Sequence, residues 1–244
     1  MKKEWFASWF DSPFYHILYK NRNDDEAQRF ITNLVQFIDL PSGSKVMDLA
    51  CGKGRHARML HQEKLDVLGV DLSPNSISSA KEHETDHLSF DVHDMREVYP
   101  NNKFDAIFNL FTSFGYFDDE SDNLKMLQSI HTMLNENGLL IIDFMNASKV
   151  IANLVEQEVK TVDNVSFSIQ RSYDGKHIFK HISFHDGEQK QQYTERVQAV
   201  LLSDFKRLLL KSNFKILRTF GDFDLNPFEE KDADRLIIIA QKTK

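Results

Sequence analysis

The spacing of apolar residues divides the chain into short strands and amphipathic helices. Continuous apolar runs typical of buried strands alternate with segments whose apolar residues recur every three or four positions. The expected strands cover residues 45–50, 65–73, 87–94, 103–111 and 139–146, followed by 214–221 and 235–242. This order predicts an α/β protein with a doubly wound, mostly parallel seven-stranded sheet of Rossmann-like type, covered by helices on both faces.

The segments between these strands carry helix start and stop signals. Three acids open residues 24–40, and Ser73 with Pro74 is expected to cap and begin a helix. Residues 118–138 have an acidic start and a glycine, Gly138, where we expect the helix to stop. Ser203 is expected to cap the last helix.

The pattern changes to a period of two after Asn146. Between about residues 155 and 202 apolar and polar positions alternate, and Asp174-Gly175 and Asp186-Gly187 stand where hairpin turns belong. We expect a small inserted antiparallel sheet. The predicted division is therefore a main α/β domain made of residues 1–146 and 203–244, with residues 147–202 as an inserted lid.

Composition narrows the classes of function. A formal net charge of −7 argues against broad affinity for nucleic-acid phosphates. One cysteine permits no internal disulfide, so we expect a cytoplasmic protein. The start of the chain is amphipathic rather than a signal peptide, and no apolar run approaches membrane-spanning length. The scattered histidines show no zinc-type spacing, so no metal is expected. The oligomeric state is not predicted.

The stretch Val46–His56, VMDLACGKGRH, is the strongest candidate for ligand binding. Gly52 and Gly54 of this stretch, with the following Ala57, satisfy the dinucleotide pattern G-x-G-x-x-[GA], but Asp48 at the strand end would repel a pyrophosphate. A phosphate-binding Walker loop fails because no Ser or Thr follows the lysine. A ligand with a cationic end fits better. S-adenosylmethionine has a sulfonium and an ammonium that Asp48 can support, and a carboxylate for the backbone near Gly54.

Residues 44–146 resemble the class I S-adenosylmethionine-dependent methyltransferases. DLACGKGRH is similar to the first motif of that family, except that Ala50 replaces its usual first glycine. VLGVDLSPNSISSAK, FDVHDMRE and FDAIFNLFTSFGYF are similar to the next three motifs in order. The resemblance implies that Asp71 holds the ribose hydroxyls and Asp94 the adenine amino group, with Met95 beside the ring. Each acid alone has an ordinary alternative as a capping or surface residue.

The resemblance therefore implies a set of cofactor-binding residues. They are Asp48, Ala50, Gly52, Gly54, Asp71, Leu72, Asp94, Met95 and Asn109, with Tyr19 and Arg22 from the N-terminal segment. In related small-molecule methyltransferases such a segment closes over the cofactor, which also makes Tyr15 a residue to test. The alternative is an amphipathic helix that merely docks on the sheet.

The aromatic loop after the fourth strand, residues 109–117, is the expected acceptor wall. The candidates in it are Asn109, Thr112, Ser113 and Tyr116, and no catalytic residue is assigned. Asn109 resembles the start of the Asn-Pro-Pro-Tyr motif of DNA and glutamine N-methyltransferases, but the next residues depart from it, so that substrate is not carried over. The acceptor is expected to enter between this loop and the inserted sheet. The acidic segment 221–235 is expected either at the pocket mouth or as a solvated hairpin loop.

The sequence thus predicts methyl transfer from S-adenosylmethionine to a small molecule, with S-adenosylhomocysteine as product. An amine nitrogen is favoured, because the inserted sheet resembles the lid of amine and amino-sugar methyltransferases and because acidity attracts a cation. An RNA or protein methyltransferase, or a cofactor-binding module without catalysis, remains an alternative. A dinucleotide dehydrogenase is the most distant one. No nucleic-acid or membrane partner is expected.

Overall fold

The computed structural model describes residues 9–10, 12–20 and 24–244. Its larger sheet has seven strands in the order β10-β11-β5-β4-β1-β2-β3. The strands are β1 (Lys45–Leu49), β2 (Asp66–Asp71), β3 (Leu88–Val92), β4 (Phe104–Asn109), β5 (Leu134–Met145), β10 (Phe214–Phe220) and β11 (Arg235–Lys242). The five from β3 to β5 are parallel, and β11 and β10 are antiparallel additions. The predicted fold class is confirmed.

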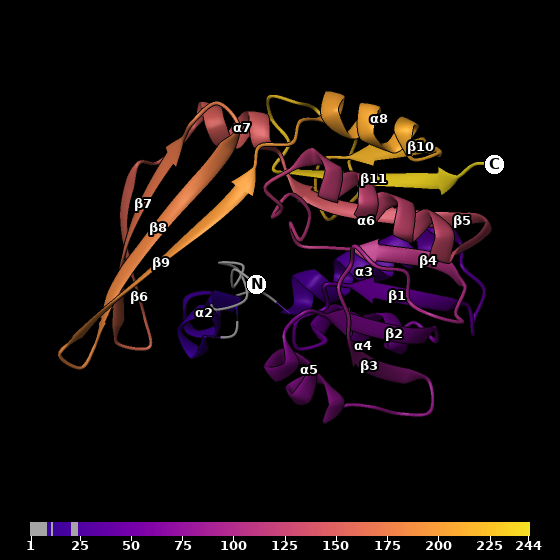
Figure 1. The fold of residues 1–244 in the computed structure, drawn as a ribbon, viewed down its shortest axis with the longest axis horizontal. Coiled ribbons are helices and arrows are strands. Elements are labelled where there is room, and N and C mark those ends of the chain that lie inside the picture. The colour runs from indigo at the N-terminus through magenta and orange to yellow at the C-terminus, as the bar shows by residue number, and fades with distance from the viewer. Residues whose placement is uncertain (1–8, 11, 21–23) are drawn as a thin grey trace.

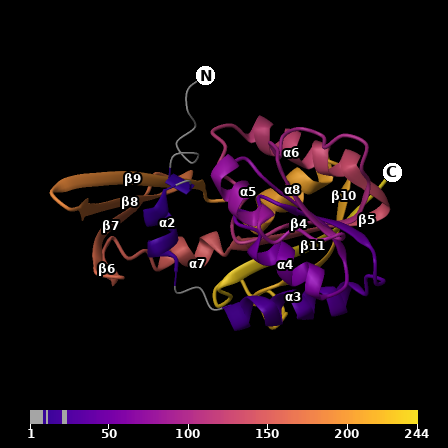
Figure 2. The same cartoon turned by 90° about the horizontal axis from the view of Figure 1, so that it is seen from below.

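Helices cover both faces of this sheet (Figures 1 and 2). One buried cluster joins the sheet to α3 (Asp24–Ile38), α4 (Arg55–Gln62) and α5 (Pro74–Lys81). A second joins the opposite face to α6 (Glu120–Met133) and α8 (Leu202–Lys211). The carboxyl ends of the parallel strands meet at one edge, which is where ligands bind in open sheets of this kind.

A separate four-stranded antiparallel sheet forms the inserted region. Its strands run in the order β6 (Gln157–Val162), β7 (Val165–Tyr173), β8 (His177–Asp186) and β9 (Gln189–Gln198), and α7 (Ala147–Ala152) leads into it. Gly175 and Gly187 have positive φ in the turns where hairpins were predicted. A third hairpin turns at Asp163 and Asn164, whose φ values of 46° and 65° match a tight two-residue turn. We call these four strands the lid sheet.

The described part of the N-terminal segment, residues 9–10 and 12–20, lies between the two sheets and includes α2 (Pro13–Leu18) (Figure 1). Its buried residues Trp9 and Leu18 share a cluster with Phe167, Ile182 and Phe184 of the lid sheet. Of the two expectations for this segment, docking on the main sheet is therefore wrong, because its apolar residues are buried against the lid sheet instead.

Two predicted helix boundaries are wrong. α6 ends at Met133 and β5 begins at once, so that Gly138 lies inside the strand rather than at a helix stop. Asn137, with a φ of 60°, takes the left-handed position there. The residue that caps the last helix, α8, is Leu201 rather than Ser203. The Leu201 N–H donates a hydrogen bond to the Asp204 carboxylate. Helix ends are the least certain part of a sequence-based assignment, because several nearby residues can serve as the cap.

Candidate functional site

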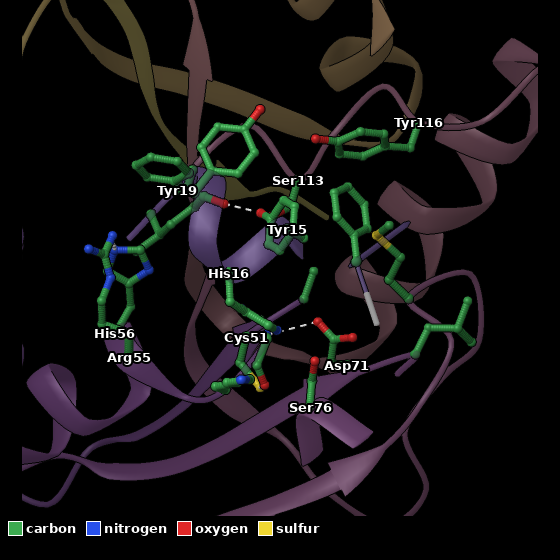
Figure 3. Close-up of a pocket in the computed structure, with 18 of the residues that line it drawn as sticks. Tyr15, His16, Tyr19, Cys51, Arg55, His56, Asp71, Ser76, Ser113 and Tyr116 are labelled. Atoms are coloured by element: carbon green, nitrogen blue, oxygen red, sulfur yellow. Dashed lines mark hydrogen bonds between the residues drawn. The ribbon is translucent and has the colours of Figure 1, made fainter. Parts of the chain in front are cut away.

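A cavity of about 340 Å³ opens at the carboxyl ends of the parallel strands (Figure 3). Loops after four neighbouring strands line it, between residues 50 and 56, 71 and 76, 93 and 96, and 110 and 117. The N-terminal segment closes it with Phe10, Tyr15, His16, Tyr19 and Lys20. In Figure 3, Tyr15, Tyr19, Ser113 and Tyr116 lie together on one side, and Asp71 and Ser76 on the other. The topology thus gathers most motifs that the sequence singled out.

The loop after β1 needs glycine for two different reasons. Gly52 has a φ of 56°, and a Cβ there would meet no described atom within 4 Å, so the space beside it is open. Gly54 has a φ of 77°, and its Cβ would lie 2.5 Å from the Phe90 ring. Gly54 does not line the cavity; its missing side chain makes room for Phe90 rather than for a ligand. Ala50 also lines the cavity. Its φ of 65° lies in the left-handed region, which is uncommon for a residue with a Cβ atom.

Asp48 is buried to 1% exposure and does not line the cavity. Burial raises the pKa of its carboxyl to about 7, against a hydrogen bond from the Ala57 N–H that lowers it. The oxygen Oδ2 has no hydrogen-bond partner among the residues that the structure describes. A direct contact between Asp48 and a cofactor therefore stays a prediction, and the structure places this carboxylate under the loop that lines the cavity.

Asp71 ends β2 and does line the cavity. Its Oδ2 accepts a 2.8 Å hydrogen bond from the Gly52 N–H, and its Oδ1 accepts one of 2.8 Å from the Ser73 N–H. The cap of α5 is instead the Ser73 hydroxyl, which accepts from the Ser76 N–H. Capping is therefore not the role of Asp71. Since a carboxylate oxygen can accept more than one hydrogen bond, these contacts are compatible with two ribose hydroxyls.

Asp94 and Met95 line the far end of the cavity together with Leu72. Asp94 is paired with Arg96, whose Nη2 lies 2.6 Å from Oδ2. Burial raises the pKa of Asp94, but the hydrogen bonds from Arg96 outweigh it, and the net shift is downward. The Arg96 guanidinium also lies 4.9 Å from the centre of the Phe117 ring. This part of the lining combines an ionised acid with apolar side chains and an aromatic ring.

The loop after β4 contains two of the predicted acceptor residues that line the cavity, Ser113 and Tyr116. Asn109 and Thr112 do not. Asn109 is fully buried and donates to the Leu49 carbonyl at 3.0 Å, while its Oδ1 has no partner among the described residues. The Thr112 hydroxyl accepts from Arg235 at 3.1 Å.

A buried ion pair that the sequence did not reveal shapes this loop. Arg235 donates to Asp143 at 2.8 Å, and the Asp143 side chain is 1% exposed. The other Asp143 oxygen accepts from the Phe111 N–H at 2.9 Å, and its carbonyl accepts from the Thr112 N–H at 2.9 Å. Phe111 and Thr112 have φ values of 60° and 62°. Two consecutive non-glycine residues in this region are strained and persist only where surrounding contacts hold them.

Aromatic rings form the side of the cavity opposite Asp71. Ring centres lie 4.9 Å apart for Tyr15 and Tyr19, 5.0 Å for Phe10 and Tyr15, and 5.3 Å for Phe10 and Tyr116. The predicted contribution of the N-terminal segment is thus present in Tyr15 and Tyr19, whereas Arg22 lies outside the described residues. The lid sheet itself contributes none of the described lining residues. On that side, the cavity is lined by the N-terminal segment, which stands between the lid sheet and the loop after β4.

The charges around the cavity are mixed rather than acidic. The lining includes Lys20, Lys53, Arg55 and Arg96 as well as Asp24, Asp71 and Asp94. The acidic segment near the C-terminus packs elsewhere: Phe223 accepts from Asn33 of α3, and Glu230 accepts from Asn146 beside α7. Its expected place at the pocket mouth is therefore wrong.

Cys51 lines the cavity as a thiol. Burial, followed by the charges of Asp48 and Asp71, raises its pKa well above the usual value. A nucleophilic role is disfavoured for that reason. Among the described residues, no group of three or more His, Cys, Asp or Glu is placed to hold a metal ion, and no helix is long and apolar enough to cross a membrane.

The sequence analysis missed three residues that shape the cavity: Arg96, Asp143 and Arg235. Arg96 follows Asp94 by two positions, so the sequence could have indicated that the two side chains form an ion pair. Asp143 and Arg235 come from opposite parts of the chain and meet because β5 and β11 are paired. No local pattern announces such a pair.

Comparisons with known proteins agree with this geometry. Residues 40–200 match the family described as a methyltransferase domain. A glycine/sarcosine N-methyltransferase of Aphanothece halophytica is 29% identical over 230 residues, covering 91% of this chain and 83% of the relative. The dTDP-3-amino-3,4,6-trideoxy-alpha-D-glucopyranose N,N-dimethyltransferase of Streptomyces venezuelae is 27% identical over 164 residues, covering 64% and 68%.

The fold is shared with solved structures. The crystal structure of a S-adenosylmethionine-dependent methyltransferase from Clostridium acetobutylicum aligns with a TM-score of 0.80 at 20% identity, covering 98% of each chain. The family match spans well over half of the chain and includes the strand-end loops that build the cavity. The chain therefore belongs to the methyltransferase-domain family, and it shares the fold of an S-adenosylmethionine-dependent methyltransferase.

Proposed function

We propose that the cavity binds S-adenosylmethionine beside a small amine and that the protein methylates the amine nitrogen. The observation that carries the proposal is the arrangement of the cavity, with strand-end acids at one end and a chamber of aromatic rings at the other. Asp71 would hold the ribose, while Asp94, Leu72 and Met95 would surround the adenine. When bound, the cofactor supplies a methyl group on a positively charged sulfur.

The residues of this chain support that assignment in their chemistry. Glycine at position 52 leaves open space beside the backbone, and Asp71 already stands at the cavity surface in hydrogen-bonded form. Leu72 is 39% exposed and lines the cavity, which suits an apolar ligand surface. Both features favour an uncharged ribose and base at this end over a pyrophosphate.

The aromatic chamber, formed by the rings of Phe10, Tyr15, Tyr19 and Tyr116, would hold the acceptor. Methyl transfer requires the nucleophile to stand in line with the methyl group and water to be excluded. Ring faces suit this step, because they are apolar and exclude water, and because their quadrupoles attract the positive charge that a neutral amine nitrogen gains as it takes the methyl group from the sulfur. Burial, followed by the nearby Glu195 carboxylate, raises the pKa of Tyr19 well above its usual value, so the Tyr19 hydroxyl stays protonated and does not act as a base.

The amine preference has a different support from the one the sequence offered. The mixed charges of the lining do not by themselves select a cation. Support comes instead from the ring faces and from the two relatives whose names specify N-methylation, of glycine or sarcosine and of an amino sugar. An RNA substrate is disfavoured by the net charge of −7.

We also propose that the protein is located in the cytoplasm. The proposed main domain consists of residues 1–146 and 203–244, and the proposed lid domain of residues 147–202.

Ligand binding and product formation test the proposal separately. S-adenosylhomocysteine at about 100 times its dissociation constant should stabilise the fold by about 2.7 kcal/mol in thermal denaturation, and NAD should not. Incubation with S-adenosylmethionine and matched amine and alcohol panels, read by mass spectrometry, should show a gain of methyl groups among the amines. Stabilisation by NAD alone would overturn the cofactor assignment. Binding without any methylated product would favour a non-catalytic module.

A further inference from the structure

The N-terminal segment shares its hydrophobic core with the lid sheet. Trp9 and Leu18 are each 1% exposed and lie in a cluster whose other described buried members belong to β6, β7 and β8. Ring centres are 4.4 Å apart for Phe14 and Phe184, and 4.5 Å apart for Trp9 and Tyr193. A segment at the start of the chain is thus fastened to strands more than 140 residues away.

One carboxylate on the lid sheet receives hydrogen bonds from both ends of this segment. The Trp9 indole N–H donates to Glu195 Oε1 at 2.7 Å, and the Tyr19 hydroxyl donates to Oε1 and Oε2 at 2.8 and 2.9 Å. Lys180, the cross-strand neighbour of Glu195, donates to the Tyr19 hydroxyl. The side chains of Glu195 and Lys180 are only 14% and 16% exposed. A low-dielectric setting strengthens such charge-assisted bonds.

This cluster continues into the cavity wall. Tyr19 lines the cavity, and Tyr15 and Phe10 connect it by ring contacts to Tyr116 of the loop after β4. Glu195 does not line the cavity. Any influence of Glu195 on a bound ligand must therefore act through Tyr19 and the segment that carries it.

We propose that Glu195 is a positioning residue that fixes Tyr19 in the cavity wall and couples the N-terminal segment to the lid sheet. The lid sheet then holds the segment in the cavity wall, and a bound ligand leaves when the segment moves away from the loop after β4. The proposal goes beyond the choice of acceptor and rests only on S-adenosylhomocysteine binding in this cavity.

A purely structural role for Glu195 makes a different prediction. In that case the carboxylate would only pair with Lys180 across β8 and β9, and its loss would loosen these strands without changing how a ligand leaves the cavity. The release rate of S-adenosylhomocysteine and the hydrogen exchange of residues 9–20 separate the two roles, because a defect confined to the pairing of β8 and β9 would change neither.

The experiment compares Glu195→Ala, Glu195→Gln and Tyr19→Phe with the matched control Thr194→Ala, in which the neighbouring residue on the opposite face of β9 is changed. Release is measured by surface plasmon resonance, and exchange by mass spectrometry. Glu195→Ala should speed release at least tenfold and raise exchange in residues 9–20 by a similar factor. Glu195→Gln should stay within about threefold of the wild type, because its amide oxygen still accepts from Trp9 and Tyr19. Thr194→Ala should match the wild type.

A double-mutant comparison covers the case in which Glu195→Ala fails to fold. The release rates of Tyr19→Phe, Glu195→Gln and the double variant are each expressed as a fold-change from the wild type. If Glu195 acts through Tyr19, the fold-change of the double variant should be smaller than the product of the two single fold-changes. Unchanged release and unchanged exchange of residues 9–20 in Glu195→Ala, or fully multiplicative effects, would overturn the proposal. Absence of binding in the wild type would instead refute the proposed cofactor, and the exchange measurement would still decide the coupling.

Discussion

The two sheets contribute to the cavity in different ways. The seven-stranded sheet supplies residues directly, because Asp71 and the loops after β1, β3 and β4 stand at strand ends. The lid sheet supplies no described lining residue and acts through the N-terminal segment packed on it. Most of the cavity lining is therefore built on the seven-stranded sheet, while the segment that closes the cavity is packed on a smaller sheet with its own core.

The contacts that hold each part differ in kind as well. On the seven-stranded sheet, the charged pair Asp143–Arg235 fixes the strained loop after β4. The lid sheet joins this loop through a buried neutral amide, Gln198, which donates from its backbone N–H to the Gly115 carbonyl and from Nε2 to the Phe117 carbonyl, both at 2.8 Å. A buried charged pair therefore shapes the wall, whereas the cover is attached by a buried neutral amide together with the more exposed ion pair between Arg196 of β9 and Asp118.

The largest expected effect comes from breaking the buried charged pair. Arg235→Met would leave the Asp143 carboxylate buried without its cation, and breaking a buried pair costs about 3–5 kcal/mol. We expect a loss of that size in the free energy of unfolding, measured by urea denaturation. Arg218→Met on the exposed side of β10 is the control and should change it by less than about 0.5 kcal/mol. Equal stability of both variants would mean that the loop does not need this pair.

The next effect concerns Asp48 and appears as a dependence on pH. The carboxyl titrates near 3.8 in an unperturbed chain and near 7 in the fold, so the folded protein holds this proton more tightly. Its contribution to stability is full below about pH 4 and is lost as the pH rises to 7, by at most roughly 4 kcal/mol. The stability of Asp48→Asn minus that of the wild type should rise over this interval. Urea denaturation at several pH values checks this, and a constant difference would contradict it.

A smaller effect is expected for Asp71, and it should appear in binding rather than folding. Two charge-assisted hydrogen bonds to the ribose contribute about 1.5 kcal/mol each at the low end, so Asp71→Ala should weaken S-adenosylhomocysteine binding by at least about 100-fold. Calorimetric titration measures this, with Asp66→Ala at the start of β2 as control. Unchanged affinity would show that Asp71 only organises the backbone of Gly52 and Ser73.

The smallest effect tests the neutral attachment of the lid sheet. Gln198→Ala removes the hydrogen bonds to Phe117 and Asn123 and leaves buried polar groups unpaired, at about 1–3 kcal/mol. We expect a modest drop in melting temperature, while the affinity for S-adenosylhomocysteine stays within about threefold of the wild type. A large loss of affinity would contradict the separation between the sheet that recognises the ligand and the sheet that covers it.

The sequence by itself determined the elements that local chemistry controls. Apolar periodicity predicted the seven strands and the inserted sheet, and Gly175 and Gly187 predicted two of its turns, because strand burial and positive φ leave marks on adjacent residues. Motif order predicted the family, and Asp71, Asp94, Ser113, Tyr116 and Tyr19 do line the cavity. The roles of these residues stay predictions until a ligand is bound.

Only the tertiary structure decided which distant residues meet. Gly54 is a glycine because of Phe90, the loop after β4 is shaped by Asp143 and Arg235, and the N-terminal segment rests on Glu195 rather than on the main sheet. Partners in these contacts are 31 to 186 residues apart. A local pattern reports which face of an element is apolar but not which other face covers it, since that depends on the packing of the whole chain.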